Sequence, residues 1–408
     1  MKIMIISLWG APPLVNSQSY RVAKIAKYLR KRGHEIIILT QGLRSKDVID
    51  QDLLDDINRY GNIRIIALKR SMIPRKDAII KLLNFLCIPD NLFFLIIMNL
   101  NKICKLIQNN KIDVIIISNT PSAYLLAYLL KDRIAVKIII DFADAWVGNP
   151  SFRPITGYHK RIFANLEKAA VSRSSALTYV SKNMGLEYEL KYPSLPKLYL
   201  PNGYDPEDFN INIQNMNRNY LTFLHFGTIY RDVNVTFAEA FAKLISQRPD
   251  LYDIARLKII GRIAKNRLAE LNYLKKFANI EIIPPITHSH LIKEILSSDY
   301  LIFSRLGKLS SYDTLASRLA ECLGSGKPVI ACCAKGSEME RICRKCGCWK
   351  VITGDNLSEM IDAYEEAIAL WRSNVKVVSN QLNSNELKEF QWDIIIEKVD
   401  QFLKELLQ

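Results

Sequence analysis

Short runs of Ile, Val and Leu alternate along the chain with segments whose apolar residues recur at helical spacing. In the first half the runs predict strands at 2–7, 35–40 and 63–68, with a helix at 19–32. A mostly helical stretch covers 77–108, and further strands are predicted at 113–118, 136–141 and 176–181. Strands that are apolar along their whole length are typical of parallel sheets covered on both faces. The order predicts an α/β fold with a doubly wound sheet.

The same rhythm restarts in the second half. Strands are predicted at 221–227, 257–261, 280–283, 300–304 and 328–331, and helices at 235–247, 267–277, 290–297 and 314–323. The segment 193–208 between the halves is rich in proline, which favours a domain boundary there. We therefore predict two domains, 1–200 and 201–385, and a last amphipathic helix at 386–408 that returns to the first domain. Because parallel sheets bind ligands at the carboxyl ends of their strands, the two domains are expected to face a cleft.

The composition of the chain indicates which classes of partner it could bind. The chain has 408 residues and a formal net charge of +15, which favours nucleic acid, phosphorylated ligands or anionic bilayer surfaces. The most apolar region, 79–100, is interrupted by Pro89-Asp90-Asn91, and neither half reaches the roughly 20 residues that a membrane span needs. The eight cysteines and the lack of a recognisable secretory signal indicate reduced thiols in a cytosol. Cys343, Cys346 and Cys348 lack a second ligand pair at zinc-finger spacing.

Two acids stand eight residues apart on the predicted helix that begins near Asp313. At 3.6 residues per turn, Asp313 and Glu321 share one stripe, and Leu319 lies on the opposite, packed side. The polar stripe can hold a ligand. The structural alternative is an N-terminal helix cap at Asp313 and a solvated Glu321.

Several motifs, in a fixed order along nearly the whole chain, together suggest a family. They are 12–13 with 19–24, Gly33-His34-Glu35, Ile88-Pro89-Asp90, 141–146, Tyr179-Val180-Ser181, 201–205, 226–232, 317–321 and 326–329. With them the chain resembles the retaining glycosyltransferases of the large family-4 group, which have two Rossmann-like domains in the GT-B architecture and include bacterial surface-polysaccharide enzymes.

The resemblance implies a nucleotide-sugar donor held by the second domain. It implies catalytic roles for Arg231, Asp313, Glu321 and Asp144, and donor contacts by Gly227, Thr228, Arg231, Gly261, Ile286, Asp313, Thr314, Leu315, Arg318 and Glu321. Glu321 is the expected ribose ligand, and Arg231, ahead of Arg318, is the expected partner of the departing diphosphate. The alternative for Arg318 is an intrahelical ion pair with Glu321. Glycines that end strands, such as Gly227 and Gly261, are also common in purely structural turns.

The acceptor is expected in the first domain. The resemblance implies contacts by Ser17, Gln18, Arg21, Asp141, Asp144 and Trp146. Asp141 and Asp144 are expected just past a buried strand, where their alternative is loop capping. Relatives usually have arginine where this chain has Ala143, and many have a glycine pair where it has 16–18. No histidine stands out as a catalyst, and His159 is interpreted as a surface residue.

The leading hypothesis is a retaining, metal-independent glycosyltransferase of the hexosyltransferase class, without a cofactor. It would move a sugar to a lipid-linked or growing polysaccharide acceptor, as in capsule or lipopolysaccharide biosynthesis. We expect a cytoplasmic protein with peripheral contact to the anionic inner face of the plasma membrane through 92–100, a stretch that could equally be a core helix. The alternatives are a nucleotide-sugar epimerase of the same architecture and a basic polyanion-binding module. Nucleic acid is not expected, because no basic and aromatic recognition motif is present.

Overall fold

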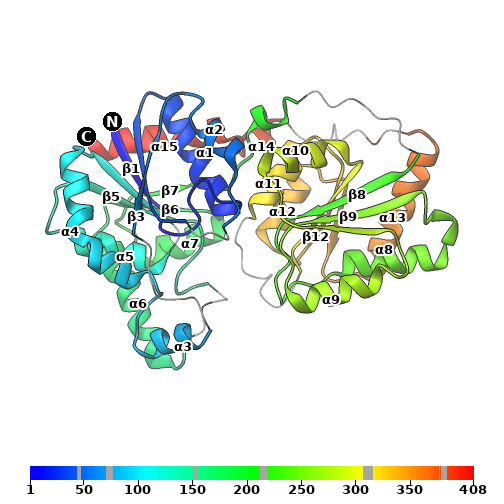
Figure 1. The fold of residues 1–408 in the computed structure, drawn as a ribbon, viewed down its shortest axis with the longest axis horizontal. Helices are drawn as coiled ribbons and strands as arrows, with labels where there is room; N and C mark the ends of the chain where they lie inside the picture. The colour runs from blue at the N-terminus through cyan, green and yellow to red at the C-terminus, as the bar shows by residue number, and fades with distance from the viewer. Residues whose placement is uncertain are drawn as a thin grey trace. The chain divides into compact units, whose positions relative to one another are not determined.

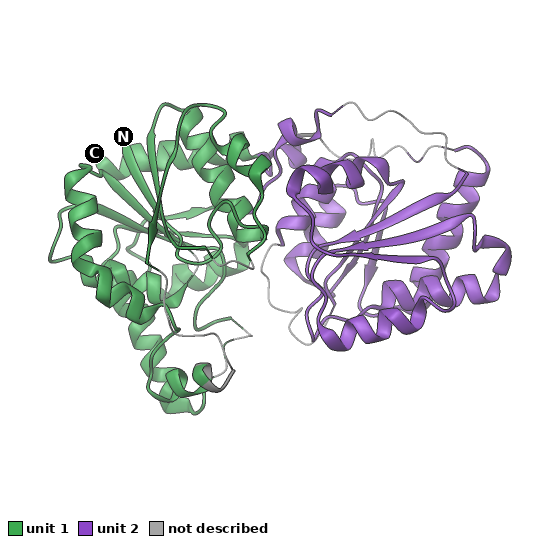
Figure 2. Cartoon of the chain, viewed as in Figure 1, with its two compact units in different colours: residues 1–201, 392–408 green, residues 202–391 purple. Residues whose placement is uncertain are grey.

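The structure is a computed structural model that describes residues 1–43, 47–69, 77–118, 120–149, 152, 154–211, 219–306, 316–375, 377 and 384–408. Within it the chain forms two compact units, residues 1–201 with 392–408, and residues 202–391 (Figure 2). Each unit is an α/β sandwich with a parallel sheet between helices (Figure 1). The fold class predicted from the sequence, two Rossmann-like doubly wound domains, is confirmed.

Unit 1 contains a seven-stranded parallel sheet in the order β3-β2-β1-β4-β5-β6-β7. Its strands are β1 (Lys2–Ile6), β2 (Glu35–Gln41), β3 (Arg64–Leu68), β4 (Val114–Ser118), β5 (Lys137–Phe142), β6 (Ala176–Tyr179) and β7 (Lys197–Tyr199). Its helices are α1 (Ser17–Lys31), α2 (Gln51–Ile57), α3 (Asp77–Phe85), α4 (Phe93–Asn109), α5 (Pro121–Leu130), α6 (Gly157–Ser172), α7 (Lys182–Lys191) and α15 (Trp392–Leu407). The chain order reverses between β1 and β4, so their carboxyl ends flank the switch point of this sheet.

Unit 2 repeats the plan with a six-stranded parallel sheet in the order β10-β9-β8-β11-β12-β13. Its strands are β8 (Leu221–Phe226), β9 (Ala255–Ile260), β10 (Ile280–Ile283), β11 (Tyr300–Ser304), β12 (Val329–Cys333) and β13 (Lys350–Thr353). Its helices are η1 (Pro206–Phe209), α8 (Thr236–Gln247), η2 (Pro249–Leu251), α9 (Lys265–Leu274), α10 (His288–Ser297), α11 (Ser317–Gly324), α12 (Glu338–Lys345), α13 (Leu357–Arg372) and α14 (Ser384–Lys388). Here the switch point lies between β8 and β11.

The last helix packs in unit 1, as predicted, but it is shorter than predicted. The expected helix 386–408 is divided into α14 and α15, and α15 begins at Trp392. The Trp392 side chain is fully buried and joins Ile396, Val399 and Leu403 of α15 in the same hydrophobic cluster as α1. The polar face of α1 also contacts α15, because Arg32 Nη1 donates to Asp393 Oδ1 at 2.7 Å. Apolar burial and this ion pair together return the chain end to the first sheet.

The helix predicted to begin at Asp313 starts later. α11 begins at Ser317, because Ala316 before it has an extended backbone with φ −69° and ψ 127°. Asp313, Thr314 and Leu315 lie outside the described residues. The prediction that Asp313 and Glu321 share one helical stripe therefore lies outside the described residues.

None of the described helices combines the length and the apolar character that crossing a bilayer requires.

Candidate donor site in unit 2

An arginine spans the switch point of the unit 2 sheet. Arg318, in the first turn of α11, donates from Nη2 to Ser304 O at 2.6 Å and from Nη1 to Phe226 O at 3.3 Å. These carbonyls end β11 and β8, the two neighbouring strands between which the chain order reverses. The guanidinium therefore lies at the sheet edge where doubly wound folds bind their ligands.

The groups that bond or contact Arg318 are uncharged. Its Nη1 lies 3.4 Å from His225 Nε2, and its guanidinium carbon lies 5.4 Å from the centre of the Phe303 ring. Burial, with a contribution from the nearby Arg305, lowers the pKa of Arg318 to about 10, so the group still carries its charge at neutral pH. No carboxylate bonds Arg318 among the residues that the structure describes. A partly buried charge without a counterion is costly, and an anionic ligand would compensate it.

His225 lies next to the Arg318 guanidinium. Burial, reinforced by the Arg318 charge, holds the pKa of His225 well below its usual value, so the ring is neutral at neutral pH. Its Nδ1 pairs with Ile302 O at 3.1 Å, which makes Nδ1 the protonated nitrogen and leaves Nε2 to accept from Arg318. The ring stacks on Phe237, with centroids 4.4 Å apart. These contacts hold the imidazole, and through it the guanidinium, in one orientation.

Two glycines leave room for the arginine. Gly227, after β8, has φ +106°, and a Cβ there would lie 3.0 Å from Arg318 Cδ. Gly261, after β9, has φ +143°, and its Cβ would lie 2.1 Å from Gly227 O. Both positions therefore require glycine for backbone conformation and for space. This gives them a structural role beside any contact with donor, and the neighbouring Thr228 is half-buried in the same turn.

Glu321 lies one turn further along α11 and is buried, with 6% of its surface exposed. Its Oε1 pairs with His288 Nε2 at 2.9 Å, at the start of α10. Both alternatives from the sequence are therefore wrong: Glu321 is neither solvated nor paired with Arg318. The helical spacing placed the two side chains close together, but a neighbouring helix supplied a partner for the carboxylate.

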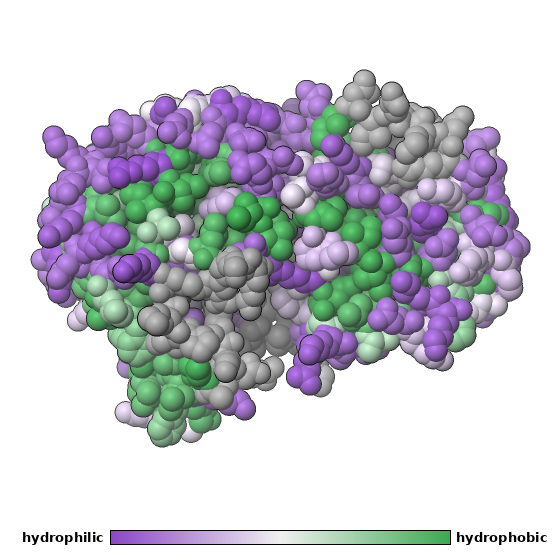
Figure 3. Space-filling model, in the orientation of Figure 1, coloured by the Kyte–Doolittle hydropathy of each residue, from purple (hydrophilic) through white to green (hydrophobic). Residues whose placement is uncertain are grey.

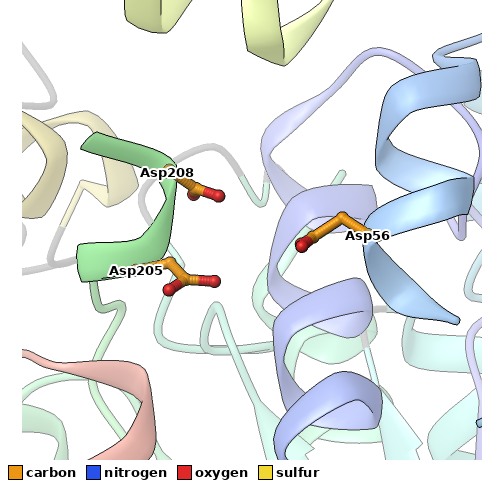
Figure 4. Close-up of side chains that lie close together, drawn as sticks. All are labelled: Asp56, Asp205 and Asp208. Atoms are coloured by element: carbon orange, nitrogen blue, oxygen red, sulfur yellow. The ribbon is translucent and has the colours of Figure 1, made fainter. Parts of the chain in front are cut away.

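His288 lies between two carboxylates of unit 2, because its Nδ1 is 3.9 Å from Asp208 Oδ2. Asp208 and Asp205 both project from η1 (Figure 4), and Asp205 caps this short helix by accepting from Glu207 N at 3.0 Å. Sequence reasoning missed His288. Its place directly after the link that follows β10 was the available signal, since side chains there lie at the ligand-binding edge of the sheet.

Two further predicted donor residues lie in links that follow strands of unit 2. Arg231 is exposed in the turn after β8, and its carbonyl accepts from Asn266 Nδ2 at 3.1 Å. Ile286 is half-buried in the link between β10 and α10. The described geometry thus brings together Gly227, Gly261, Arg318 and Glu321. Within this group Arg318 is the cation whose side chain is held in place, whereas the sequence favoured Arg231.

The predicted acceptor residues of unit 1 divide into two groups. Asp141 does not follow a strand: it lies within β5, is fully buried, and its Oδ1 accepts from Arg21 Nη2 at 2.9 Å. Gln18 is also buried and donates to Ser118 Oγ at 3.0 Å, and that hydroxyl donates to Asp141 Oδ2 at 2.7 Å. Four of the predicted residues, Gln18, Arg21, Asp141 and Trp146, are therefore parts of the interior.

Trp146 cannot stack on a sugar from where it lies. Its side chain is 2% exposed and its ring packs 6.4 Å from that of Tyr124. Ser17 and Asp144 are exposed and remain the acceptor candidates on this unit. Ala143 is buried beside Asp141, and Asn16 caps α1 by accepting from Ser19 N at 2.8 Å, so the segment without the glycine pair serves to start a helix.

Two buried cysteines of unit 2 and one acid of unit 1 have defined surroundings in the structure. Cys343 and Cys346 are buried, and Cys343 Sγ lies 3.9 Å from Cys333 Sγ, so these thiols pack within unit 2. Asp56 of α2 in unit 1 (Figure 4) accepts from Lys24 Nζ at 2.7 Å and from Lys27 Nζ at 2.8 Å.

Comparison with known proteins places the fold. No protein-family model matches the chain, and the search of curated proteins gives no match. Among solved structures the chain is similar to sucrose-phosphate synthase from Thermosynechococcus elongatus, with a TM-score of 0.70, 14% identity, and coverage of 99% of this chain and 98% of that one. It is also similar to Anabaena HepE in complex with UDP-glucose, with a TM-score of 0.68, 13% identity, and coverage of 99% and 100%.

A third similar structure is WaaG, a glycosyltransferase involved in lipopolysaccharide biosynthesis, with a TM-score of 0.64, 13% identity, and coverage of 98% and 99%. A putative UDP-N-acetylglucosamine 2-epimerase from Listeria monocytogenes also matches, with a TM-score of 0.58, 12% identity, and coverage of 99% and 96%. At these identities the similarity shows the GT-B fold across the whole chain.

Proposed function

We propose that this GT-B protein is a glycosyltransferase, and that the site around Arg318 and Glu321 binds its nucleotide-sugar donor. The observation that carries the proposal is Arg318 at the switch point of unit 2, charged and held only by neutral acceptors among the described residues. A nucleoside diphosphate is the leaving group of such a donor, and its negative charge grows as the sugar bond breaks. A fixed guanidinium stabilises that charge.

Glu321 fits the ribose of the same donor. With His288 bonded to Oε1, the second carboxylate oxygen stays available to accept a hydroxyl hydrogen bond. His288 fixes the direction of the carboxylate, so it is a positioning residue in this scheme. Arg231, exposed after β8, adds a second cation near the same strand end.

We further propose retention of configuration, without a metal or a cofactor. In this scheme a phosphate oxygen of the departing diphosphate takes the proton of the acceptor hydroxyl on the face that the diphosphate leaves. The new glycosidic bond forms as the sugar–phosphate bond breaks, so no covalent enzyme intermediate is needed. The protein supplies positioning and charge stabilisation. The acceptor is proposed to be a lipid-linked or growing surface saccharide, in keeping with the similarity to WaaG, and Ser17 and Asp144 are its candidate contacts.

Thermal stabilisation by a panel of nucleotide-sugars, including UDP-glucose, tests the donor site directly. A bound donor raises the unfolding temperature, because the free energy of unfolding increases by RT ln(1 + L/Kd), where L is the donor concentration. Glu321→Ala and His288→Ala should each weaken the stabilisation, the first more than the second. His290→Ala, on the exposed side of the same helix, is the matched control. Full stabilisation of the Glu321→Ala protein would refute the ribose contact.

The second candidate is a nucleotide-sugar epimerase, favoured by the similarity to the Listeria protein. Incubation with donor alone separates the two functions. An epimerase converts the sugar of the donor, whereas a transferase leaves it unchanged and releases nucleoside diphosphate quickly only when an acceptor is present. The anomeric configuration of the product, read by NMR, tests retention. Loss of transfer in a chelator would contradict metal independence.

A further inference from the structure

Large apolar side chains gather on the surface of unit 1 over α3 and the start of α6. Figure 3 shows this hydrophobic area at the lower end of the unit. It is formed by Leu82, Phe85, Leu86, Ile155 and Tyr158, which we call the apolar surface, and Phe85 and Tyr158 are 63% and 69% exposed. Scattered exposed apolar residues are ordinary, but a contiguous group marks a binding surface.

The two segments of the apolar surface are joined by defined contacts. His159 Nε2 lies 3.3 Å from Phe85 O, and its Nδ1 lies 2.8 Å from the hydroxyl of Thr156, the residue that caps α6. The His159 ring also lies 6.2 Å from the Phe85 ring and 6.1 Å from the Tyr158 ring. His159 therefore holds the end of α3 against α6, so the exposed rings are presented by a fixed scaffold.

The charges around the apolar surface are positive. Lys81, Lys160 and Arg161 are all exposed on its two helices. Asp90 is the only acid within 79–111 and 154–166, and its carboxylate accepts from two backbone amides, Leu92 N at 2.8 Å and Ser122 N at 2.9 Å. The described side chains of 79–111 and 154–166 thus combine exposed apolar and aromatic groups with cations, and the single carboxylate of these two ranges is engaged.

The combination of exposed apolar side chains and cations indicates which kind of partner the apolar surface can bind. A second copy of the chain would bring the same cations against this surface, and like charges would oppose the contact. An anionic bilayer instead accepts apolar side chains at the headgroup boundary and attracts lysine and arginine, while tyrosine is favoured at the interface. We propose that the apolar surface docks unit 1 on the surface of a bilayer containing anionic lipids, without crossing it. A lipid-linked acceptor would meet the enzyme there.

The next helix along extends the same character. α4 buries Leu95, Ile96 and Leu100, but exposes Phe94, Ile97 and Met98, the last with 85% of its surface accessible. The sequence left open whether 92–100 is a core helix or a membrane contact. The structure shows that it is a core helix on one side, and that apolar residues are exposed on its other side.

Sedimentation with vesicles tests the proposal, with phosphatidylcholine alone compared with phosphatidylcholine mixed with phosphatidylglycerol. The full chain should bind the anionic vesicles at least tenfold better than the neutral ones, and added salt should reduce the difference. Leu82→Glu combined with Leu86→Glu should reduce binding at least tenfold. Leu190→Glu, at a still more exposed leucine on α7 of the same unit, should leave it unchanged.

A second set of variants tests the role of the cations. Lys160→Glu with Arg161→Glu should weaken binding to anionic vesicles about tenfold, whereas Lys168→Glu, further along α6, should have little effect. Equal binding to both vesicle types, or equal loss in the Leu190→Glu control, would overturn the proposal. So would a dimer in solution that dissociates in the Leu82/Leu86 variant, because the surface would then be a contact between copies.

The outcome is independent of the donor site. Each surface variant should keep the thermal stabilisation by nucleotide-sugars that the unchanged chain shows, since all the substitutions lie in unit 1. Loss of vesicle binding with donor stabilisation intact supports the docking surface. A folded chain that binds vesicles but no nucleotide-sugar would refute the proposed function and leave the docking surface standing.

Discussion

Each unit holds an arginine of one helix against its sheet, Arg21 of α1 in unit 1 and Arg318 of α11 in unit 2, and the two arginines differ in what neutralises them. Arg21 in unit 1 is buried and bonds both oxygens of Asp141, as well as the carbonyls of Leu200 and Pro201. Arg318 in unit 2 bonds only neutral acceptors among the described residues. The first arginine has a counterion within its own fold, whereas the second can take one from a ligand. The two units thus differ in whether the charge of this arginine is compensated by a carboxylate of the same unit.

The largest effect is expected from breaking the internal pair. Asp141→Ala leaves Arg21 buried without a counterion, and it also removes the acceptor of Ser118 and Thr178. Removing one partner of a buried ion pair costs about 3–5 kcal/mol, so the free energy of unfolding should fall by that amount. Urea unfolding measures it. Arg21→Met combined with Asp141→Leu should lose less than Asp141→Ala alone, and a loss below about 1 kcal/mol in the single variant would contradict a structural pair.

The second prediction concerns Arg318, which no described carboxylate bonds. Arg318→Gln should weaken nucleoside diphosphate binding by about 2–3 kcal/mol, because it removes a charged donor to the ligand. The free energy of unfolding should change by less than about 1 kcal/mol, since no ion pair is broken. Calorimetric titration with UDP measures the first quantity. Arg231→Gln tests the second, exposed cation in the same way, and a larger loss there than at Arg318 would return the diphosphate contact to Arg231.

A third prediction tests the space around Arg318. Gly261→Ala should lower the free energy of unfolding by about 1–3 kcal/mol, because the new Cβ meets Gly227 O at 2.1 Å and φ is +143°. Gly336→Ala separates the two causes, since Gly336 has φ +76° but no neighbouring atom within 4 Å. Thermal or urea unfolding of both variants gives the comparison. Equal losses would mean that backbone conformation alone, and not close approach, requires glycine at 261.

The smallest prediction sharpens the role of His225. Its pKa is depressed in the folded protein by burial and by Arg318, so the unfolded chain binds a proton that the folded chain does not. Stability from this residue is therefore present above the unfolded pKa near 6.5 and is lost as the pH falls below it. Between pH 7 and pH 6 the expected loss is about 0.7 kcal/mol. His225→Phe should flatten this part of the stability profile, whereas an unchanged slope would mean that another group, such as His34, is responsible.

The strands were predictable because they carry their own signal. β1, β4 and β11 are buried along their whole length or nearly so, and such strands read as continuous apolar runs in the sequence. The elements that sequence reasoning missed have weak or different patterns. β7 is a three-residue edge strand without a fully buried position, and α5 is apolar on nearly all sides, so neither shows a clear periodicity.

The site was only partly predictable, for a different reason. The spacing of Arg318 and Glu321 within α11 is local, so the sequence predicted that both lie on one helix. It also predicted that Gly227 and Gly261 belong to the same site. The alternative for Arg318 was a pair with Glu321, but the structure pairs Glu321 with His288, 33 residues away. In unit 1 the pairing of Arg21 with Asp141 spans 120 residues, and it turns a predicted acceptor contact into part of the interior.

The sequence by itself therefore determined the alternation of buried strands and amphipathic helices, the two-domain plan and the cationic character of the chain. Those properties follow from hydrophobic periodicity and composition, which are local or summed quantities. Only the tertiary structure decided which arginine is neutralised internally and which stays charged beside neutral carbonyls. Charge compensation depends on which side chains meet in space, and contacts between distant segments leave no periodic mark in the sequence.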